Sequence, residues 1–334
     1  MSELPTVTVI MPVIDEEQHL ADSVARILEQ QYPGQLNVVI AVGPSKDRTR
    51  EVAGALAAES ARVTVVDNPS GRTPSGLNAA IAAARGEVIV RVDGHAMIPA
   101  DYVAIAVATL DRTGADNVGG IMAAEGVTDF GIAVARAMTS KFGVGGASFH
   151  IGGDEGPAPT VYLGSFRRSA LERVGGYDDS MVRAQDWEMN LRIRETGGLI
   201  WFTPQMKVTY RPRASVLALA RQYHDYGRWR REVVRRHPDT LSLRYLAAPV
   251  AVAAIAVGLL LVASGVISGH AWLACMGLVP PVGYIAANLL ASALTAVSAP
   301  ALRLPSAVRL PVVYATMHLS WGTGFLRGGA GRDQ

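Results

Sequence analysis

Two residues that could bind a metal ion together, Asp93 and His95, stand two positions apart in the stretch EVIVRVDGHAMIP, residues 87–99. The stretch begins as a buried strand, so both side chains follow the end of that strand. A carboxylate and an imidazole placed in this way can hold one divalent ion. Carboxylate oxygens suit Mg²⁺ or Mn²⁺, and such an ion could neutralise a diphosphate. A turn in which Asp93 and Gly94 simply end the strand is the alternative interpretation.

The segments that must position this pair alternate between strand and helix. Apolar runs typical of buried strands occupy residues 6–14, 36–42, 62–68 and 87–93, and helical patterns occupy residues 15–32, 45–60 and 74–86. Alternating elements with short connections predict an α/β domain with a mainly parallel sheet. Ligands of such sheets bind beyond the carboxyl ends of the strands, where Asp93 stands.

Charge is distributed unevenly along the 334 residues, although the formal net charge is only +2. Residues 1–210 carry 18 Lys and Arg against 25 Asp and Glu, whereas residues 211–244 carry nine Arg against three acids. We therefore expect an acidic globular domain over 1–210, a basic connector over 211–244 and an apolar tail over 245–327. An acidic domain argues against a nucleic-acid partner, because phosphate backbones need a basic face. The single cysteine, Cys275, allows no disulfide within the chain, which suits a reducing compartment.

The apolar tail contains about three segments that could cross a membrane. Residues 245–267 form an uncharged run of 23 residues, and a bilayer span needs roughly 20. A second run extends from Trp272 to about Ala299, and we expect Pro280-Pro281 to break or kink it. The third run, residues 310–326, could span the membrane or lie at its interface.

The arginines that precede residue 245 predict the orientation. Positive charge beside a span stays in the cytoplasm, so we expect a multi-pass protein of the plasma or inner membrane with a cytoplasmic globular domain. Three spans would place Arg327 and Arg332 outside, which conflicts with the same rule. Within the connector, residues 215–236 have apolar positions at helical spacing among the arginines. This pattern is typical of a helix on an anionic membrane surface, and equally of one packed on the globular domain.

Further motifs extend the pattern around Asp93. They are MPVIDEE (11–17) after the first strand, SKDRT (45–49) after the second, NPSGRTPSGLNAAIAAARGEVIVRVDGHAMIP (68–99) and VYLGSFRRSALERVGGYDDSMVRAQDWEMNLRIRETGG (161–198). In order and spacing they resemble the family 2 inverting glycosyltransferases of the GT-A fold, and more narrowly the exopolysaccharide members of the succinoglycan type. The resemblance covers about two-thirds of the chain. It implies a Rossmann-like GT-A domain followed by C-terminal transmembrane helices.

The resemblance implies roles for three residues. Asp93 matches the first acid of the family's Asp-x-Asp motif and His95 stands in the place of the second, so both would bind the metal that holds the donor diphosphate. Asp186 matches the family's general base. Inversion needs such a base, because the acceptor hydroxyl attacks the anomeric carbon in line and must lose its proton. The metal and nearby cations would stabilise the departing diphosphate. Asp186 also reads as a carboxylate at a helix N-terminus, which is compatible with catalysis.

The resemblance also implies two groups of binding residues. The donor side would comprise Pro12, Asp15, Glu16, Ser45, Asp47, Asn78, Arg91 and Asp93. The acceptor side would comprise Gly164, Gln185, Trp187, Arg211, Arg213 and Gln222. Asp47 could equally well be a cap on the helix that follows it. The loop 152–159 would border the acceptor site or be a mobile surface loop.

The sequence departs from the family pattern in several places. Val42 and Gly43 replace two acids, the first of which reads the nucleotide base, so a uridine donor is not assured. Asp15 replaces a common Asn, and Gln185 replaces the Glu before the base. The Gln-x-x-Arg-Trp motif of processive synthases is absent, since QYHDYGRW (222–229) has five residues between Gln and Arg. This favours a single transfer over polymerisation.

Taken together, these features predict a membrane-anchored, metal-dependent inverting glycosyltransferase. It would pass one sugar from a nucleotide-sugar donor to a polyprenyl-diphosphate-linked acceptor in cell-envelope or exopolysaccharide synthesis. A lipid-linked acceptor follows from location, because a soluble acceptor would not need apolar spans. One alternative is a polyprenyl-phosphate glycosyl synthase, with Arg211 and Arg213 near the lipid phosphate. Another is an inactive GT-A scaffold subunit, suggested by Val42 and Gly43. A transporter is disfavoured because the tail lacks intramembrane acids. The oligomeric state stays open.

Overall fold

The computed structural model describes residues 4–299 and 301–329, which form two compact units. The first, here called the sheet unit, comprises residues 1–123 and 147–210. The second, the helical unit, comprises residues 124–146 together with the chain from 211 onward. Residues 124–146 therefore differ from the expected boundaries, which placed them inside the globular domain.

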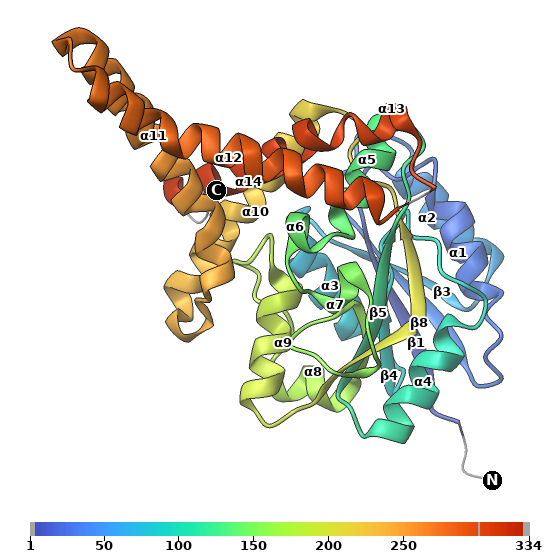
Figure 1. The fold of residues 1–334 in the computed structure, drawn as a ribbon. Helices are drawn as coiled ribbons and strands as arrows, with labels where there is room; N and C mark the ends of the chain where they lie inside the picture. The colour runs from blue at the N-terminus through green and yellow to red at the C-terminus, as the bar shows by residue number, and fades with distance from the viewer. Residues whose placement is uncertain (1–3, 300, 330–334) are drawn as a thin grey trace. The chain divides into compact units, whose positions relative to one another are not determined.

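One eight-stranded sheet with the order β3-β2-β1-β4-β7-β5-β8-β6 organises the sheet unit (Figure 1). The strands are β1 (Val7–Val13), β2 (Leu36–Val42), β3 (Val63–Asp67), β4 (Val88–Arg91), β5 (Asn117–Ala124), β6 (Gly156–Pro157), β7 (Tyr162–Arg167) and β8 (Ile200–Tyr210). The first four are mutually parallel, whereas β7 runs antiparallel to both β4 and β5. The prediction of a mainly parallel α/β sheet is confirmed.

Helices cover both faces of this sheet because β1 alternates its apolar side chains between two cores. Val7, Val9 and Met11 belong to one hydrophobic cluster, and Ile10 belongs to the other. The first cluster receives α1 (Leu20–Leu28), α2 (Thr49–Glu59) and α4 (Tyr102–Thr113). The second receives α3 (Thr73–Ala83), α8 (Arg168–Val174) and α9 (Gln185–Glu195). A short α7 (Ser148–Ile151) completes the unit. Burying each large apolar side chain contributes about 1.5–3 kcal/mol, so both faces fix the strand ends firmly.

The helical unit contains the apolar tail. Its helices are α5 (Asp129–Met138), α6 (Lys141–Val144), α10 (Val216–Arg236), α11 (Leu243–Ser268), α12 (Ala271–Val297), α13 (Leu304–Ala307) and α14 (Leu310–Arg327), with a 3₁₀ turn at Pro238–Thr240. Among the described residues, two helices are long and apolar enough to cross a membrane by length and composition: α11 with 26 residues and α12 with 27. The described residues therefore contain two candidate spans, whereas the sequence suggested about three.

Close backbone contacts explain how α11 and α12 form a hairpin. A Cβ on Gly258 would lie 2.5 Å from the carbonyl oxygen of Gly277, so only glycine permits this approach. Pro280 and Pro281 lie inside α12, which continues from Ala271 to Val297. Of the predicted break or kink at the two prolines, the break does not occur, since membrane-type helices tolerate proline where neighbouring groups satisfy the backbone.

The third apolar segment forms α14, which packs along α10. A Cβ on Gly227 would lie 2.0 Å from the Trp321 carbonyl oxygen, and one on Gly324 would lie 2.0 Å from that of His224. The apolar stripe of α10, which includes Leu219 and Tyr223, is buried. The helical spacing predicted for the connector is thus present, and its apolar face has a partner inside the helical unit.

Candidate active site

The turn that carries Asp93 and His95 is pressed against the end of β1. Val92 continues the line of β4, since its N–H donates to the Ile10 carbonyl at 3.1 Å. The Ala96 N–H then closes a turn onto the Asp93 carbonyl at 2.9 Å. A Cβ on Gly94 would lie 2.9 Å from Val13 Cγ1, so glycine lets the turn pack this closely. Asp93 is therefore held at the carboxyl edge of the sheet, as the strand pattern predicted.

Arg91, the last residue of β4, joins two carboxylates. Its side chain is 5% exposed. Its Nε and Nη2 donate to Asp93 Oδ1 at 3.1 and 2.9 Å, and its Nη1 donates to Asp186 Oδ1. Burial acts to lower the pKa of Arg91, but Asp186 and Asp93 raise it well above its usual value. The guanidinium stays charged and brings together residues 95 positions apart in the sequence.

Asp186 stands at the N-terminus of α9, where the helix dipole favours a carboxylate. Its side chain is 32% exposed. Desolvation raises the pKa of Asp186, and Asp93 raises it further, while Arg91 opposes both. A raised pKa makes the carboxylate a better proton acceptor near neutral pH. Ala184, which precedes the helix, has φ 59, a conformation that costs a residue other than glycine about 1–3 kcal/mol.

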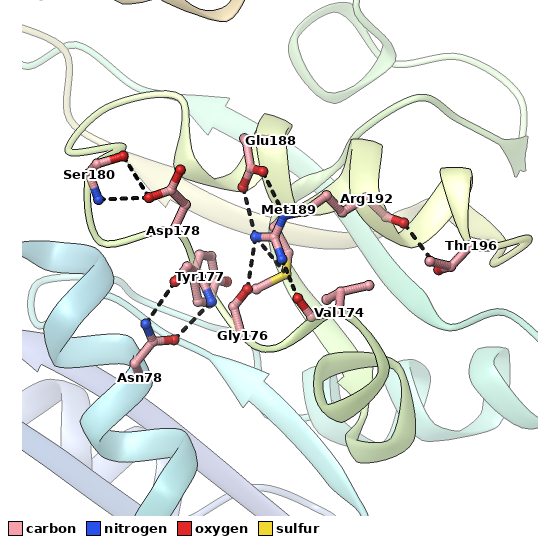
Figure 2. A network of polar contacts seen from close by, with 10 residues as sticks. All are labelled: Asn78, Val174, Gly176, Tyr177, Asp178, Ser180, Glu188, Met189, Arg192 and Thr196. Carbon is pink, nitrogen blue, oxygen red and sulfur yellow. Dashed lines mark hydrogen bonds and ion pairs between the residues drawn. The ribbon is translucent and has the colours of Figure 1, made fainter. Parts of the chain in front are cut away.

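A network of polar contacts holds the start of α9 in place (Figure 2). Arg192 donates from Nε and Nη2 to the Glu188 carboxylate at 2.6 and 2.7 Å. The same guanidinium donates to the carbonyls of Val174 and Gly176 at 2.5 and 2.8 Å. The loop between α8 and α9 is thus tied to the helix that carries Asp186.

Asn78 of α3 also bonds the loop between α8 and α9 (Figure 2). The Tyr177 N–H donates to Asn78 Oδ1 at 2.8 Å, and Asn78 Nδ2 donates to the Tyr177 carbonyl at 2.8 Å and to Asp179 Oδ1 at 3.1 Å. The resemblance suggested that Asn78 binds the donor. The structure shows its amide bonded to the loop before α9, and the donor contact of Asn78 stays a prediction.

The sequence analysis missed three tyrosines whose pKa values Asp93 and Asp186 influence. Burial raises the pKa of Tyr177, and Asp186 raises it further. Burial and Asp93 likewise raise the pKa values of Tyr102 and Tyr162. The Tyr177 ring packs edge-on against Phe166 at 6.5 Å between centroids. In the sequence these tyrosines look like ordinary core residues, because only the tertiary fold brings them to Asp93 and Asp186.

Hydrogen bonds connect the loop that follows β1 to the loop that follows β2. The Asp15 N–H donates to Ser45 Oγ at 3.2 Å, and the Lys46 N–H donates to Asp15 Oδ1 at 2.7 Å. Asp47 accepts the N–H of Glu17 at 3.1 Å and that of Thr49 at 3.0 Å. Desolvation acts to raise the pKa of Asp47, but the hydrogen bonds from Thr49 and from the Glu17 N–H lower it.

These bonds bring Asp15, Ser45 and Asp47 together at one edge of the sheet, and their donor-side role stays a prediction. The bond between Asp47 and the first residue of α2 also fits the capping alternative. Pro12 lies in β1, and the buried Val42 and Gly43 end β2 beside it. The Gly43 N–H donates to the Val13 carbonyl at 2.9 Å, which holds the residue after β2 against the end of β1.

Asp93 and His95 offer a donor set that fits a divalent cation. His95 Nδ1 donates to Glu16 Oε1 at 2.6 Å, and metal-binding histidines commonly give one ring nitrogen to a carboxylate while the other coordinates the ion. Both Arg91 bonds to Asp93 go to Oδ1. The described residues contain no group of three or more His, Cys, Asp or Glu suited to a metal. An ion such as Mg²⁺ held by two protein groups would take its remaining ligands from phosphate and water.

The residues predicted for the acceptor side fall into both units. Gln185 and Trp187 flank Asp186 on α9 and are half-buried. Gly164 lies buried in β7 with φ +87, and a Cβ there would lie 2.6 Å from the Phe166 ring. Its glycine is thus required by the fold.

Three further residues predicted for the acceptor side belong to the helical unit. Arg211 donates to the Glu125 carbonyl at 3.2 Å, Gln222 donates to the Tyr226 hydroxyl at 2.9 Å, and Arg213 is exposed. The partners Glu125 and Tyr226 belong to the helical unit as well.

The loop 152–159 is anchored at Glu155. This carboxylate accepts from Arg112 and from Trp201 Nε1 at 2.8 Å, and the bonds from Arg112 and Trp201 lower its pKa. A pocket lined by Tyr32, Glu87 and Arg168 lies near the beginnings of β1 and β4. Its lining includes none of the predicted site residues, so the candidate site rests on the side-chain geometry at the strand ends.

Comparison with known proteins identifies the class. Residues 8–175 match the family described as Glycosyl transferase family 2. Succinoglycan biosynthesis protein ExoA of Rhizobium meliloti (strain 1021) is 34% identical over 321 residues, which cover 96% of this chain and 93% of ExoA. The chain belongs to glycosyl transferase family 2 and is a glycosyltransferase, which confirms the family and the enzyme class that the motifs predicted.

Two more distant proteins complete the comparison. A Methanococcus voltae protein named dolichyl N-acetyl-alpha-D-glucosaminyl phosphate 3-beta-D-2,3-diacetamido-2,3-dideoxy-beta-D-glucuronosyltransferase is 23% identical over 246 residues, covering 69% of this chain and 74% of its own. Among solved structures, mannosyltransferase PcManGT from Pyrobaculum calidifontis, in complex with GDP-Man and Mn²⁺, superposes with a TM-score of 0.60. It is 22% identical, and the match covers 97% of this chain and 88% of that one. This likeness supports the GT-A fold.

Proposed function

We propose that this protein is a metal-dependent inverting glycosyltransferase that moves one sugar from a nucleotide-sugar donor to a lipid-linked acceptor. The observation that carries the proposal is the Arg91 bridge between Asp93 and Asp186. It sets the carboxylate proposed for the donor side next to the carboxylate proposed as base, at the carboxyl edge of a GT-A sheet.

Asp186 would act as the base. Arg91 bonds only Oδ1 of Asp186, and within the described part of the chain no residue donates to Oδ2. Oδ2 would take the proton of the acceptor hydroxyl as that oxygen attacks the anomeric carbon from the side opposite the leaving nucleotide. Arg91 fixes the direction of the carboxylate, as a third group commonly orients a catalytic base.

Asp93 and His95 would hold Mg²⁺ or Mn²⁺ on the donor side. When bound, the ion would offset the charge of the donor diphosphate and of the leaving nucleoside diphosphate. The His95–Glu16 bond supports this assignment, and so does the Mn²⁺ found with GDP-Man in PcManGT. Asp15, Ser45 and Asp47 would border the nucleotide, with base recognition altered by Val42 and Gly43.

The acceptor would be an isoprenoid-linked glycan at the plasma or inner membrane. Two apolar helices of 26 and 27 residues support membrane association. ExoA belongs to succinoglycan biosynthesis, and the Methanococcus voltae relative is named for adding a sugar to a dolichyl-phosphate-linked sugar. These names favour extension of a lipid-linked sugar over transfer to a bare polyprenyl phosphate. Two spans would also return Arg327 to the cytoplasmic side together with the sheet unit, in agreement with the positive-inside rule.

Thermal stability of the detergent-purified protein with UDP, GDP and dTDP, each with Mn²⁺ or with chelator, tests the donor half. One nucleotide should raise the melting temperature only with the metal. Product analysis then tests the acceptor half, because an extended lipid-linked glycan differs from a monosaccharide on lipid monophosphate. A folded sample that responds to no nucleotide would favour the inactive scaffold instead.

A further inference from the structure

Arg91 is the one cation, among the described residues, that bonds either carboxylate of the candidate site. It reaches both from a single buried position at the end of β4. One guanidinium thus serves two anions that come from separate segments of the sheet unit. The two ion pairs join one positive and two negative charges, and the side chains of Asp93 and Asp186 are 25% and 32% exposed.

This charge balance has a consequence for the Asp93 carboxylate. Asp93 Oδ1 already accepts two N–H groups of Arg91, at 3.1 and 2.9 Å. A divalent cation on the same carboxylate would lie close to the guanidinium, and two cations at that separation repel each other, strongly so away from bulk water. Arg91 also pairs with Asp186, so the guanidinium keeps one counter-ion when its bonds to Asp93 weaken.

We propose that Arg91 is a shared counter-ion that competes with the divalent cation for Asp93 and thereby couples the donor side to the base. Arg91 bonds both carboxylates before the ion binds and keeps only Asp186 afterwards. The inference rests on the proposed function, and it replaces the donor contact first assigned to Arg91 with a positioning role. By linkage, a change at Asp186 must then alter the affinity of an ion held at Asp93, although Asp186 does not ligate it.

The proposal predicts opposite effects for two single substitutions. Arg91→Met removes the competitor and leaves more negative charge around Asp93, so Mn²⁺ should bind more tightly, by about fivefold or more. Asp186→Asn removes one anion and leaves Arg91 to Asp93 alone, so Mn²⁺ should bind more weakly by a similar factor. A direct contact between Arg91 and the diphosphate would predict no tightening for Mn²⁺ alone.

The experiment is an electron paramagnetic resonance titration of Mn²⁺ alone into the full chain in detergent, which needs neither donor nor turnover. Arg85→Met is the matched control, because Arg85 is exposed and precedes β4 at the opposite edge of the sheet. In the double variant Arg91→Met/Asp186→Asn the competing guanidinium is absent, so Asp186→Asn should lose most of its effect and the Mn²⁺ affinity should stay close to that of Arg91→Met. If Arg91→Met does not fold, Arg91→Lys is titrated in its place, because lysine keeps the positive charge but cannot bond both carboxylates at once.

The results separate the inference from the function on which it rests. If Asp93→Asn abolishes Mn²⁺ binding while the Arg91 and Asp186 variants leave it unchanged, the metal position stands and the coupling is wrong. Weaker Mn²⁺ binding in Arg91→Met would also overturn the coupling. If Asp93→Asn does not affect Mn²⁺ binding at all, both the metal position and the coupling are wrong.

Discussion

Two clusters of acids lie at the same edge of the sheet, and they use their carboxylates differently. In the first, Asp93 and Asp186 pair with the buried side chain of Arg91. In the second, Asp15 and Asp47 accept backbone N–H groups of the loops after β1 and β2. Bonds to backbone amides fix a loop, whereas an ion pair between side chains can exchange partners when a charged ligand arrives. The first cluster is therefore equipped for chemistry and the second for shaping the place where a donor would bind.

The largest effect should come from removing the donor-side acid of the first cluster. Asp93→Ala should abolish metal-dependent nucleotide binding and lower transfer by about a hundredfold or more, since a metal contributes several kcal/mol of charge stabilisation. Calorimetry with nucleotide and Mn²⁺ measures the binding. Asp22→Asn on the exposed face of α1 serves as the control. Unchanged binding in Asp93→Ala would remove the metal role from this cluster.

The pH dependence of transfer should show the raised pKa of Asp186. The base must be deprotonated, so activity falls as the pH falls through that pKa. Because desolvation raises it, the acid limb should lie above the ordinary aspartate value of about 3.9. A profile of kcat/KM against pH locates the limb, because this ratio reports the pKa values of the free protein. A limb at or below the ordinary value would contradict the environment described for Asp186.

An intermediate effect should follow from loosening the clamp on the loop before α9. Asn78→Ala strips partners from the N–H and carbonyl of Tyr177, which should cost about 1–3 kcal/mol of stability. We expect kcat to fall more than KM changes, because Asp186 is displaced while the donor contacts remain. Asn78→Asp keeps the acceptor for the Tyr177 N–H but sets a second carboxylate beside Asp179, so it should not restore the lost stability. A selective rise in KM would restore the donor-binding role first assigned to Asn78.

The smallest effect should come from the second cluster. Asp47→Asn removes the charge and one of the two oxygens that accept the Glu17 and Thr49 N–H groups, which loosens a loop but leaves Asp93 and Asp186 in place, so transfer should fall by less than about tenfold. Because the pKa of Asp47 is lowered in the folded protein, its stabilising effect is present above the ordinary aspartate pKa and is lost as the pH falls through the lowered value. Melting temperatures of both proteins across that range measure this. A loss of activity as large as that of Asp93→Ala would erase the distinction between the clusters.

Local patterns were sufficient to predict the strands, the helices and the edge of the sheet at which Asp93 lies. Apolar alternation and helical period are properties of neighbouring residues, so β1 to β4 and α1 to α3 follow from them. The motifs also named Arg91 and Asp186, but not their ion pair, which joins segments 95 residues apart. The contact of Asn78 with the backbone of Tyr177 likewise has no local signature, because the two residues are 99 positions apart.

The helical unit shows the same limit on a larger scale. Hydropathy along the chain identified α11 and α12, because a long apolar run is a local property. It could not show that residues 310–326 pack along α10, since this depends on Gly227 and Gly324 meeting the backbone of the opposite helix. Nor could it show that residues 124–146 belong with the later helices.

The central claim is that Asp186 is the base and that Asp93 lies on the donor side of the same site. Its most direct test measures donor affinity and transfer for Asp186→Asn in one preparation, beside the unchanged protein. We predict that the donor nucleotide with Mn²⁺ binds within about the fivefold to tenfold change expected from coupling, while transfer falls by about a hundredfold or more. Normal transfer by Asp186→Asn would contradict the claim.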